Sequence, residues 1–334
     1  MILPMYLVEI AEDHNRGTLG CLMGVFLSLG TLFAYLTGPY LSVQNFCLVC
    51  TVPMLIFLPL FSVWNPESPQ YLAARNNPEQ LKTCLSKLRN QPVEAVEKEI
   101  VSMTHMIQEL NRNKGGIKEL FSARNLRKGL IISVVLISLQ QFSGINAVLS
   151  YMQTIFSATQ SELSPEISSL VVAIIQVCVT LLTSVLVDRV GRKVLLLTSL
   201  TGSAISLIAL ATYFFLLDNH FNVSALSWLP VLSLVVFIIS YNLGLASVPW
   251  AVIAEIFPPN VKSLALTLTT VVCFIGASII TLYFPSMVSF FGMASSFWIF
   301  GGVCIFGCVF VFFRLLETKG RSLQEILNLL GNSR

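Results

Sequence analysis

The chain has 334 residues, of which 55% are hydrophobic and only 11% are charged. Because soluble domains carry about 25% charged residues, this composition excludes an ordinary soluble domain and predicts an integral protein of the lipid bilayer. The formal net charge of +3 gives no indication of a nucleic-acid partner.

The chain opens with an apolar segment, residues 1–10, that is too short to cross a bilayer. The segment lacks a basic n-region, which argues against a signal peptide. We interpret it as the last turns of a helix whose beginning is missing.

Uncharged windows then mark the predicted membrane spans. Residues 17–66 and residues 263–313 are each long enough for two helices. Four shorter windows hold one helix each: residues 129–161, 167–187, 194–217 and 219–254. At about 20 residues a crossing, the windows predict eight spans. They lack the alternation of barrel strands, so an all-α membrane protein is expected.

A charged stretch, residues 76–124, interrupts the apolar windows. It carries apolar residues at helical spacing, such as Leu81, Leu85 and Leu88. The spacing predicts short amphipathic helices, and a solvated linker is an equally good interpretation of the pattern.

The loops carry their charges asymmetrically. All 20 Lys and Arg residues fall on one side of the predicted spans, and the positive-inside rule places that side in the cytoplasm. The other side carries the sequon Asn222-Val-Ser224, which makes Asn222 a candidate glycosylation site.

The cysteines and histidines predict no metal centre and no disulfide framework. Cys47 and Cys50 have the spacing of a redox or zinc motif, but they lie in an apolar span where simple packing is the expected role. The three histidines are far apart in the sequence, and the glycines form no phosphate loop. We therefore expect no enzymatic activity and no cofactor.

An internal repeat relates the two ends of the chain. Glu9 precedes Arg16 by seven residues, and Glu255 precedes Lys262 by seven. A second acidic motif follows 58 residues after Glu9 and 62 residues after Glu255. Parallel repeats of this kind are common in transporters. The counterpart of the segment before Glu255 would precede residue 1, so several helices are expected to be missing from the N-terminal side.

The most informative stretch is residues 140–151, where two glutamines, a Ser-Gly pair and an asparagine interrupt an uncharged run. Unpaired amides in hydrocarbon cost several kcal/mol, so polar groups within spans tend to face pathways. Amides donate and accept hydrogen bonds in pairs, which suits a neutral polyhydroxylated solute; packing between helices is the alternative role. Gln141 and Asn146 lie about 140° apart on a regular helix, so a break at Ser143-Gly144 is predicted.

Six motifs in chain order resemble those of the sugar porter family of the major facilitator superfamily, in particular its insect facilitated trehalose transporters and facilitated glucose transporters. The motifs are residues 4–9 with Arg16, 66–69, 140–146, 188–193, 249–258 and 317–320.

The resemblance implies a major facilitator superfamily fold of twelve helices in two halves, with the N-terminal half incomplete in this chain. About eight full transmembrane helices and a helix stub are expected. Residues 1–66 would be the remnant of the N-terminal half, and residues 67–126 a cytoplasmic helical linker. Residues 127–316 would form the C-terminal half, and residues 317–334 a cytoplasmic tail.

The resemblance also implies a sugar site. Its residues would be Gln140, Gln141, Asn146, Gln176, Asn242 and Trp250. The amides would bond sugar hydroxyls, and the indole would pack against the apolar face of the ring. Tyr151 matches an outer gating tyrosine, while Ser150 replaces the other member of the usual tyrosine pair.

Charged residues at the predicted helix ends form a candidate cytoplasmic latch. Its members are Glu9, Arg16, Asp188, Arg189, Arg192, Glu255 and Lys262. Ion pairs near water are individually weak, but a network that breaks as a unit could bias a two-state equilibrium. Topology anchoring, the alternative, accounts for the bases and not for the repeated glutamates.

The chain departs from the family pattern at three places. The usual Asn-Trp of the eleventh helix is Cys273-Phe274, which removes one polar sugar contact. Lys262 stands where Arg is usual, and Lys lacks the bidentate fork of Arg. Leu316 replaces the proline expected before Glu317.

Facilitative, alternating-access transport of a hexose or trehalose, at the plasma membrane, is the function that the resemblance implies. Two alternatives stay open: a truncated isoform or incomplete gene model without transport of its own, and a non-transporting sugar sensor.

Overall fold

The computed structural model describes residues 6, 10, 16–75, 77–92, 95–97, 99–101, 103–105, 117–158, 164–317, 325 and 329. Within these ranges only the backbone is described for residues 16–23, 64, 74, 117–119, 165, 184–189 and 259. The described residues form helices and no strand, so the predicted all-α class is confirmed.

The chain divides into two compact units. The first comprises Met1–Leu27 and Leu36–Lys114, and the second comprises Ser28–Tyr35 and Gly115–Arg334. Helix α2 (Arg16–Thr37) therefore contributes its central residues to the second unit. The four segments predicted from the sequence stay a prediction.

The first unit contains one long apolar helix and a small helical cluster. Helix α3 (Val43–Trp64) begins where the Ser42 hydroxyl accepts a hydrogen bond from the Asn45 backbone N–H, and it is joined to α2 by the 3-10 turn Gly38–Tyr40. Helices α4 (Pro69–Ala74) and α5 (Pro78–Arg89) follow.

Helix α5 is amphipathic and has a core of its own. Leu81, Cys84 and Leu85 are buried on one face of α5, and Leu72, Val96 and Ile100 complete the cluster. The predicted helical spacing of this stretch is thus confirmed over Pro78–Arg89, and the interpretation as a solvated linker is wrong there.

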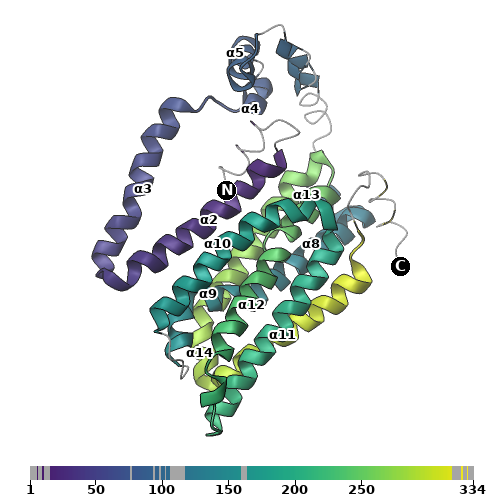
Figure 1. The fold of residues 1–334 in the computed structure, drawn as a ribbon. Coiled ribbons are helices and arrows are strands. Elements are labelled where there is room, and N and C mark those ends of the chain that lie inside the picture. The colour runs from purple at the N-terminus through teal and green to yellow at the C-terminus, as the bar shows by residue number, and fades with distance from the viewer. Residues whose placement is uncertain are drawn as a thin grey trace. The chain divides into compact units, whose positions relative to one another are not determined.

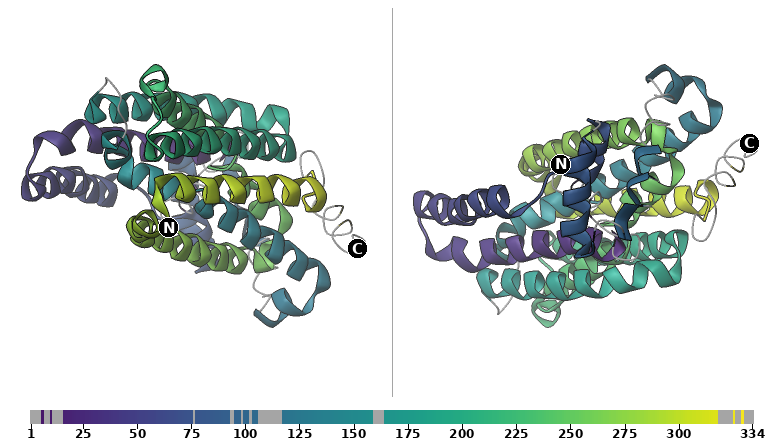
Figure 2. Two further views of the ribbon diagram at one scale, coloured as in Figure 1. Left: turned by 90° about the horizontal axis from the view of Figure 1, so that it is seen from below. Right: turned by 90° about the horizontal axis from the view of Figure 1, so that it is seen from above.

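The second unit is a helical bundle around a single large apolar core. Its elements are α7 (Ile117–Ser122), α8 (Arg124–Phe142), α9 (Ile145–Ser157), α10 (Pro165–Val190), α11 (Arg192–Asp218), the 3-10 turn Ser224–Leu226, α12 (Leu229–Leu243), α13 (Val248–Ile256) and α14 (Pro259–Arg314). Helix α11 packs against both α12 and α14, and α8 packs against α14 (Figure 1). End-on views show the same bundle (Figure 2).

Three irregular points interrupt these helices. Ser143 and Gly144 separate α8 from α9, and residues 244–247 separate α12 from α13. Helix α14 has 56 residues with non-helical Gly292 inside it. At 1.5 Å per residue its length is about 84 Å, far more than the roughly 30 Å hydrocarbon core of a bilayer, so its two parts on either side of Gly292 must be separate crossings.

Six stretches within the described residues are long and apolar enough to cross a membrane. They are Val43–Val63, Arg124–Ser157, Glu166–Thr183, Arg192–Asp218, Ser224–Ile256 and Asn260–Arg314. The last holds both parts of α14, and α2 with its 22 residues is not among the six. A multi-pass membrane protein is therefore confirmed, whereas the count of eight crossings stays a prediction.

Candidate functional site

The break between α8 and α9 depends on Gly144. This residue has φ +87°, a left-handed conformation that favours glycine. A Cβ atom at this position would lie 2.5 Å from Cδ2 of Phe300 on α14. Both the backbone conformation and the close approach of α14 therefore require glycine, and the predicted break at Ser143-Gly144 is confirmed.

The break brings three of the predicted sugar-site amides together. The Nδ2 of Asn146 donates to Oε1 of Gln141. The Nε2 of Gln141 donates to Oε1 of Gln140 at 3.2 Å and to Sγ of Cys273 at 3.0 Å. Gln140 and Gln141 are buried, and Asn146 is half-buried. On a regular helix Gln141 and Asn146 would face different directions, so the break creates this cluster.

Gln140 also reaches the second break. Its Nε2 donates to the backbone carbonyls of Leu245 at 2.7 Å and Ala246 at 3.0 Å, between α12 and α13. Gly244 permits this arrangement, because a Cβ there would lie 2.4 Å from the Leu195 carbonyl oxygen of α11. The two breaks thus lie side by side.

Two further predicted residues form a separate polar group. The Oγ1 of Thr180 donates to Oδ1 of Asn242 at 3.3 Å and to the Gln176 carbonyl at 2.7 Å. The Nδ2 of Asn242 donates to the Ile238 carbonyl at 2.8 Å. Oε1 of Gln176 is buried without a hydrogen-bond partner in the described part of the chain. No hydrogen bond between described residues links this group to the amide cluster.

Sequence reasoning missed two members of this group. Ser28 of α2 is 2% exposed, and its Oγ lies 3.0 Å from Oγ1 of Thr180. Both are hydroxyls within uncharged windows, which is the signal that singled out the amides, but a single hydroxyl can also be satisfied by its own helix.

Two tyrosine hydroxyls hold α9 near a distortion at Tyr151, whose φ of −116° and ψ of 19° are not helical. The Tyr151 hydroxyl donates to the Thr281 carbonyl of α14 at 3.0 Å, and its ring centroid lies 5.3 Å from that of Phe284. The Tyr35 hydroxyl of α2 donates to the Leu149 carbonyl. Trp250, the remaining predicted sugar residue, is half-buried on α13 against the core.

The latch is represented by one ion pair between α11 and α13. The Arg192 guanidinium contacts Oε1 of Glu255 through Nη2 at 2.9 Å and through Nε at 3.1 Å. Oε2 of Glu255 is buried and makes no hydrogen bond to a described residue. Lys262 lies partly buried near the start of α14. Glu9 and the side chains of Arg16, Asp188 and Arg189 lie outside the described residues.

Glu317 adds a contact that the sequence reasoning did not assign. Its carboxylate accepts hydrogen bonds from the backbone N–H groups of Arg192 at 3.0 Å and Lys193 at 3.1 Å. An anion at a helix N-terminus is favourable because the first N–H groups have no partner within the helix. Lys193 reciprocates, since its Nζ donates to the Phe312 carbonyl at 2.8 Å. The end of α14 is thereby tied to the start of α11.

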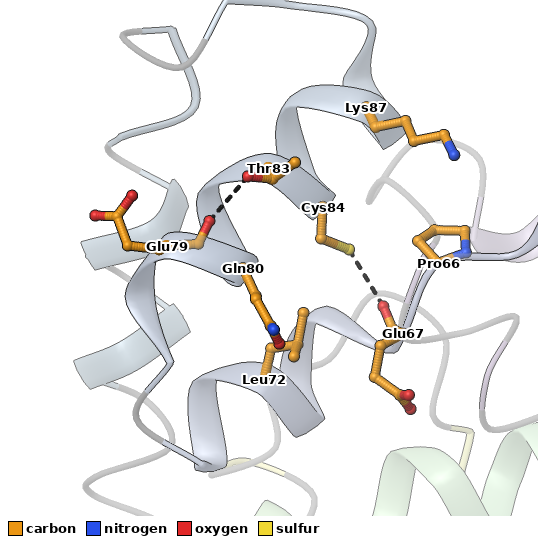
Figure 3. A pocket seen from close by; sticks show the side chains of 8 residues that line it. All are labelled: Pro66, Glu67, Leu72, Glu79, Gln80, Thr83, Cys84 and Lys87. Carbon is orange, nitrogen blue, oxygen red and sulfur yellow. Dashed lines mark hydrogen bonds between the residues drawn. The ribbon is translucent and has the colours of Figure 1, made fainter.

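A small pocket lies within the first unit. Its lining residues are Pro66, Glu67, Leu72, Glu79, Gln80, Thr83, Cys84 and Lys87 (Figure 3). The Cys84 thiol donates to the Glu67 carbonyl at 3.2 Å. Burial raises the pKa of this thiol. Among the described residues no group of His, Cys, Asp or Glu is arranged to hold a metal ion.

The chain is similar to known sugar transporters over nearly its whole length. The profile of a family described as "Sugar (and other) transporter" matches residues 1–330. A facilitated trehalose transporter of Bombyx mori is 34% identical over 334 residues, which are 99% of this chain and 65% of that protein. The facilitated trehalose transporter of Anopheles gambiae is 33% identical over 97% of this chain and 41% of its own length.

A solved structure shows the same fold. A major facilitator superfamily proton:xylose symporter bound to 6-bromo-6-deoxy-D-glucose has a TM-score of 0.74 and 25% identity, and the match covers 99% of this chain and 70% of the symporter. The present chain spans less than two thirds of the length of the insect relatives.

Proposed function

Because this chain belongs to the sugar transporter family, we propose that it carries a neutral sugar, a hexose or trehalose, across a membrane by facilitated alternating access. The relatives are transporters of trehalose and xylose by name, and the proposal includes no enzymatic reaction. The observation that carries it is the uncharged amide cluster of Gln140, Gln141 and Asn146 at a helix break in the apolar bundle.

Neutral amides suit a neutral polyol. Each amide can donate and accept, as a sugar hydroxyl also does, and no charged group needs to lose its water when the sugar arrives. Gln141 and Asn146 are the proposed direct ligands. Gln176 offers a buried acceptor without a partner among the described residues, Asn242 lies beside it, and Trp250 offers an aromatic face.

The proposed membrane setting follows the charges. We place the Lys- and Arg-rich loops in the cytoplasm and the protein in the plasma membrane. Asn222 and Ser224 are then outside, both exposed, with the Ser224 N–H donating to Oδ1 of Asn222 at 3.1 Å. Glycosylation at Asn222 is proposed; replacing Asn222 by Gln should abolish an enzymatically removable shift in electrophoretic mobility.

The site is tested by sugar binding and uptake in Gln141→Ala and Asn146→Ala. A lost hydrogen bond is worth about 1 kcal/mol, so each variant should bind trehalose or glucose about fivefold more weakly. Binding is measured through thermal stabilisation of the purified full chain, and transport through radiolabelled uptake into proteoliposomes. Gln153→Ala, an exposed amide on α9, is the matched control. If both site variants keep wild-type affinity and uptake, the site assignment is wrong.

A further inference from the structure

The amide cluster has a direction. We propose that Asn146, Gln141 and Gln140 form a hydrogen-bond relay that couples the break between α8 and α9 to the break between α12 and α13. In this relay Gln140 is a positioning residue and not a sugar ligand. The inference rests on the proposed function for one point only, the identity of the solute at the Asn146 end.

Every amide in the relay donates onward to the next group. Asn146 donates to Gln141, Gln141 donates to Gln140, and Gln140 donates to the backbone of the second break. Amide nitrogen and oxygen positions alternate along the chain without a clash of two donors or two acceptors. Hydrogen bonds arranged head to tail polarise one another, so the chain is stronger than isolated pairs.

The relay ends at a carbonyl that lacks its ordinary donor. In a helix the Leu245 carbonyl would accept from the backbone N–H of residue 249, but residue 249 is proline and has none. Leu245 is fully buried, and a buried carbonyl without a partner is costly. Gln140 supplies the missing donor at 2.7 Å and places its other hydrogen on Ala246 at 3.0 Å.

Gln140 has no hydrogen left for a sugar. An amide has two N–H donors, and both are directed to backbone carbonyls, while Oε1 accepts from Gln141. Its side chain is only 4% exposed. Asn146 differs, because it is half-buried and the hydrogen bonds described for it leave its Oδ1 available. The solute therefore meets the relay at Asn146.

Neighbouring groups hold the relay in this geometry. Cys273 accepts from Gln141, and a Cβ at Gly276 would lie 3.1 Å from Cβ of Gln141. Ser199 accepts the Leu245 N–H at 3.0 Å. A hydroxyl that donates to Oδ1 of Asn146 would strengthen each bond down to Leu245. Helix α13, which begins three residues later and carries Trp250, would respond.

The test gives the relay a titratable member, in protein without sugar. Trp64, Trp228 and Trp298 are replaced by Phe, so that Trp250 alone reports, and Gln140→Glu is then introduced. The protonated carboxyl keeps one donor for Leu245, and the ionised form keeps none. The titratable side chains described around the relay are Tyr241 and Cys273, and both are present in the parent. The relay predicts a single pH titration of Trp250 emission in Gln140→Glu that is absent in the parent and in Gln153→Glu.

Sugar binding supplies the second readout. On the acidic side of that titration Gln140→Glu should bind trehalose or glucose within about threefold of the parent, and on the alkaline side about tenfold more weakly. If the emission of Trp250 does not titrate, the relay is overturned. If the parent binds neither sugar, the proposed function fails while the sugar-free titration still decides the relay.

A folding failure of Gln140→Glu is also informative. Pro249→Ala restores a backbone N–H that can reach the Leu245 carbonyl. The double variant Gln140→Glu with Pro249→Ala should therefore recover the yield of monodisperse protein in size-exclusion chromatography. A double variant that is no better than the single one would overturn the proposal.

Discussion

Gly144 decides more of the site than any polar residue does. Its left-handed φ turns the chain so that Asn146 can reach Gln141, and its missing side chain leaves room for Phe300 of α14. Sequence reasoning placed a break here because a glycine and a serine lay between amides on different faces. It could not supply Phe300, which lies 156 residues further along the chain.

Gly144→Ala should destabilise the protein by roughly 3 kcal/mol, because a left-handed alanine costs about 1–2 kcal/mol and overpacking against Phe300 costs about 1–3 kcal/mol. Gly302→Ala is the matched control on α14, where an added Cβ meets nothing within 4 Å. It should raise stability by about 0.5–1 kcal/mol through helix propensity. Thermal unfolding in detergent measures both, and equal midpoints for the two variants would contradict the assignment.

At the scale of elements, the linker helix α5 shows how far periodicity carries. Leucines at a spacing of three and four residues predicted an amphipathic helix, and Leu81 and Leu85 are indeed buried on one face of it. Periodicity could not distinguish this packed helix from a solvated one, since the partners Val96 and Ile100 come from a later segment. Cys84, between those leucines, became buried for the same reason.

Cys84 should react slowly with maleimide reagents. The thiolate is the reactive species, burial raises the pKa of the Cys84 thiol, and the side chain is buried. The labelling rate should therefore rise only at higher pH, and at neutral pH it should be at least about tenfold below that of the exposed neighbour in Cys84→Ala with Thr83→Cys. Peptide mass spectrometry against time measures both sites. Similar rates at the two positions would mean that the α5 core is open.

Within the second unit, α11 is connected to α13 and to the end of α14 by charged groups. Arg192 pairs with Glu255, and Glu317 caps α11 while Lys193 reaches Phe312. The repeat in the sequence singled out Glu255 and marked Glu317 as part of a motif. The partner of Glu317 is the backbone of α11, and a backbone N–H carries no mark in the sequence.

Glu255→Gln should shift the balance between inward- and outward-facing forms of the carrier. The change removes the charge from a partly buried pair, and a loss of about 1 kcal/mol changes a two-state ratio about fivefold. The shift is measured as accessibility of single cysteines to an impermeant maleimide in right-side-out and inside-out vesicles. Glu166→Gln, an exposed carboxylate in the first turn of α10, should leave the ratio unchanged. An unchanged ratio in Glu255→Gln would remove the latch.

Membrane class, the apolar spans, the helix break at Gly144 and the family are readable from the sequence, because hydrophobicity, backbone propensity and motif spacing are properties of neighbouring residues. The choice of hydrogen-bond partners is not. Gln140 looks like a sugar ligand in the sequence, and packing directs it to Leu245, 105 residues away. That partner exists because Pro249 withholds a donor and Gly244 lets α12 lie against α11. Only the folded bundle brings the deprived carbonyl and the amide together.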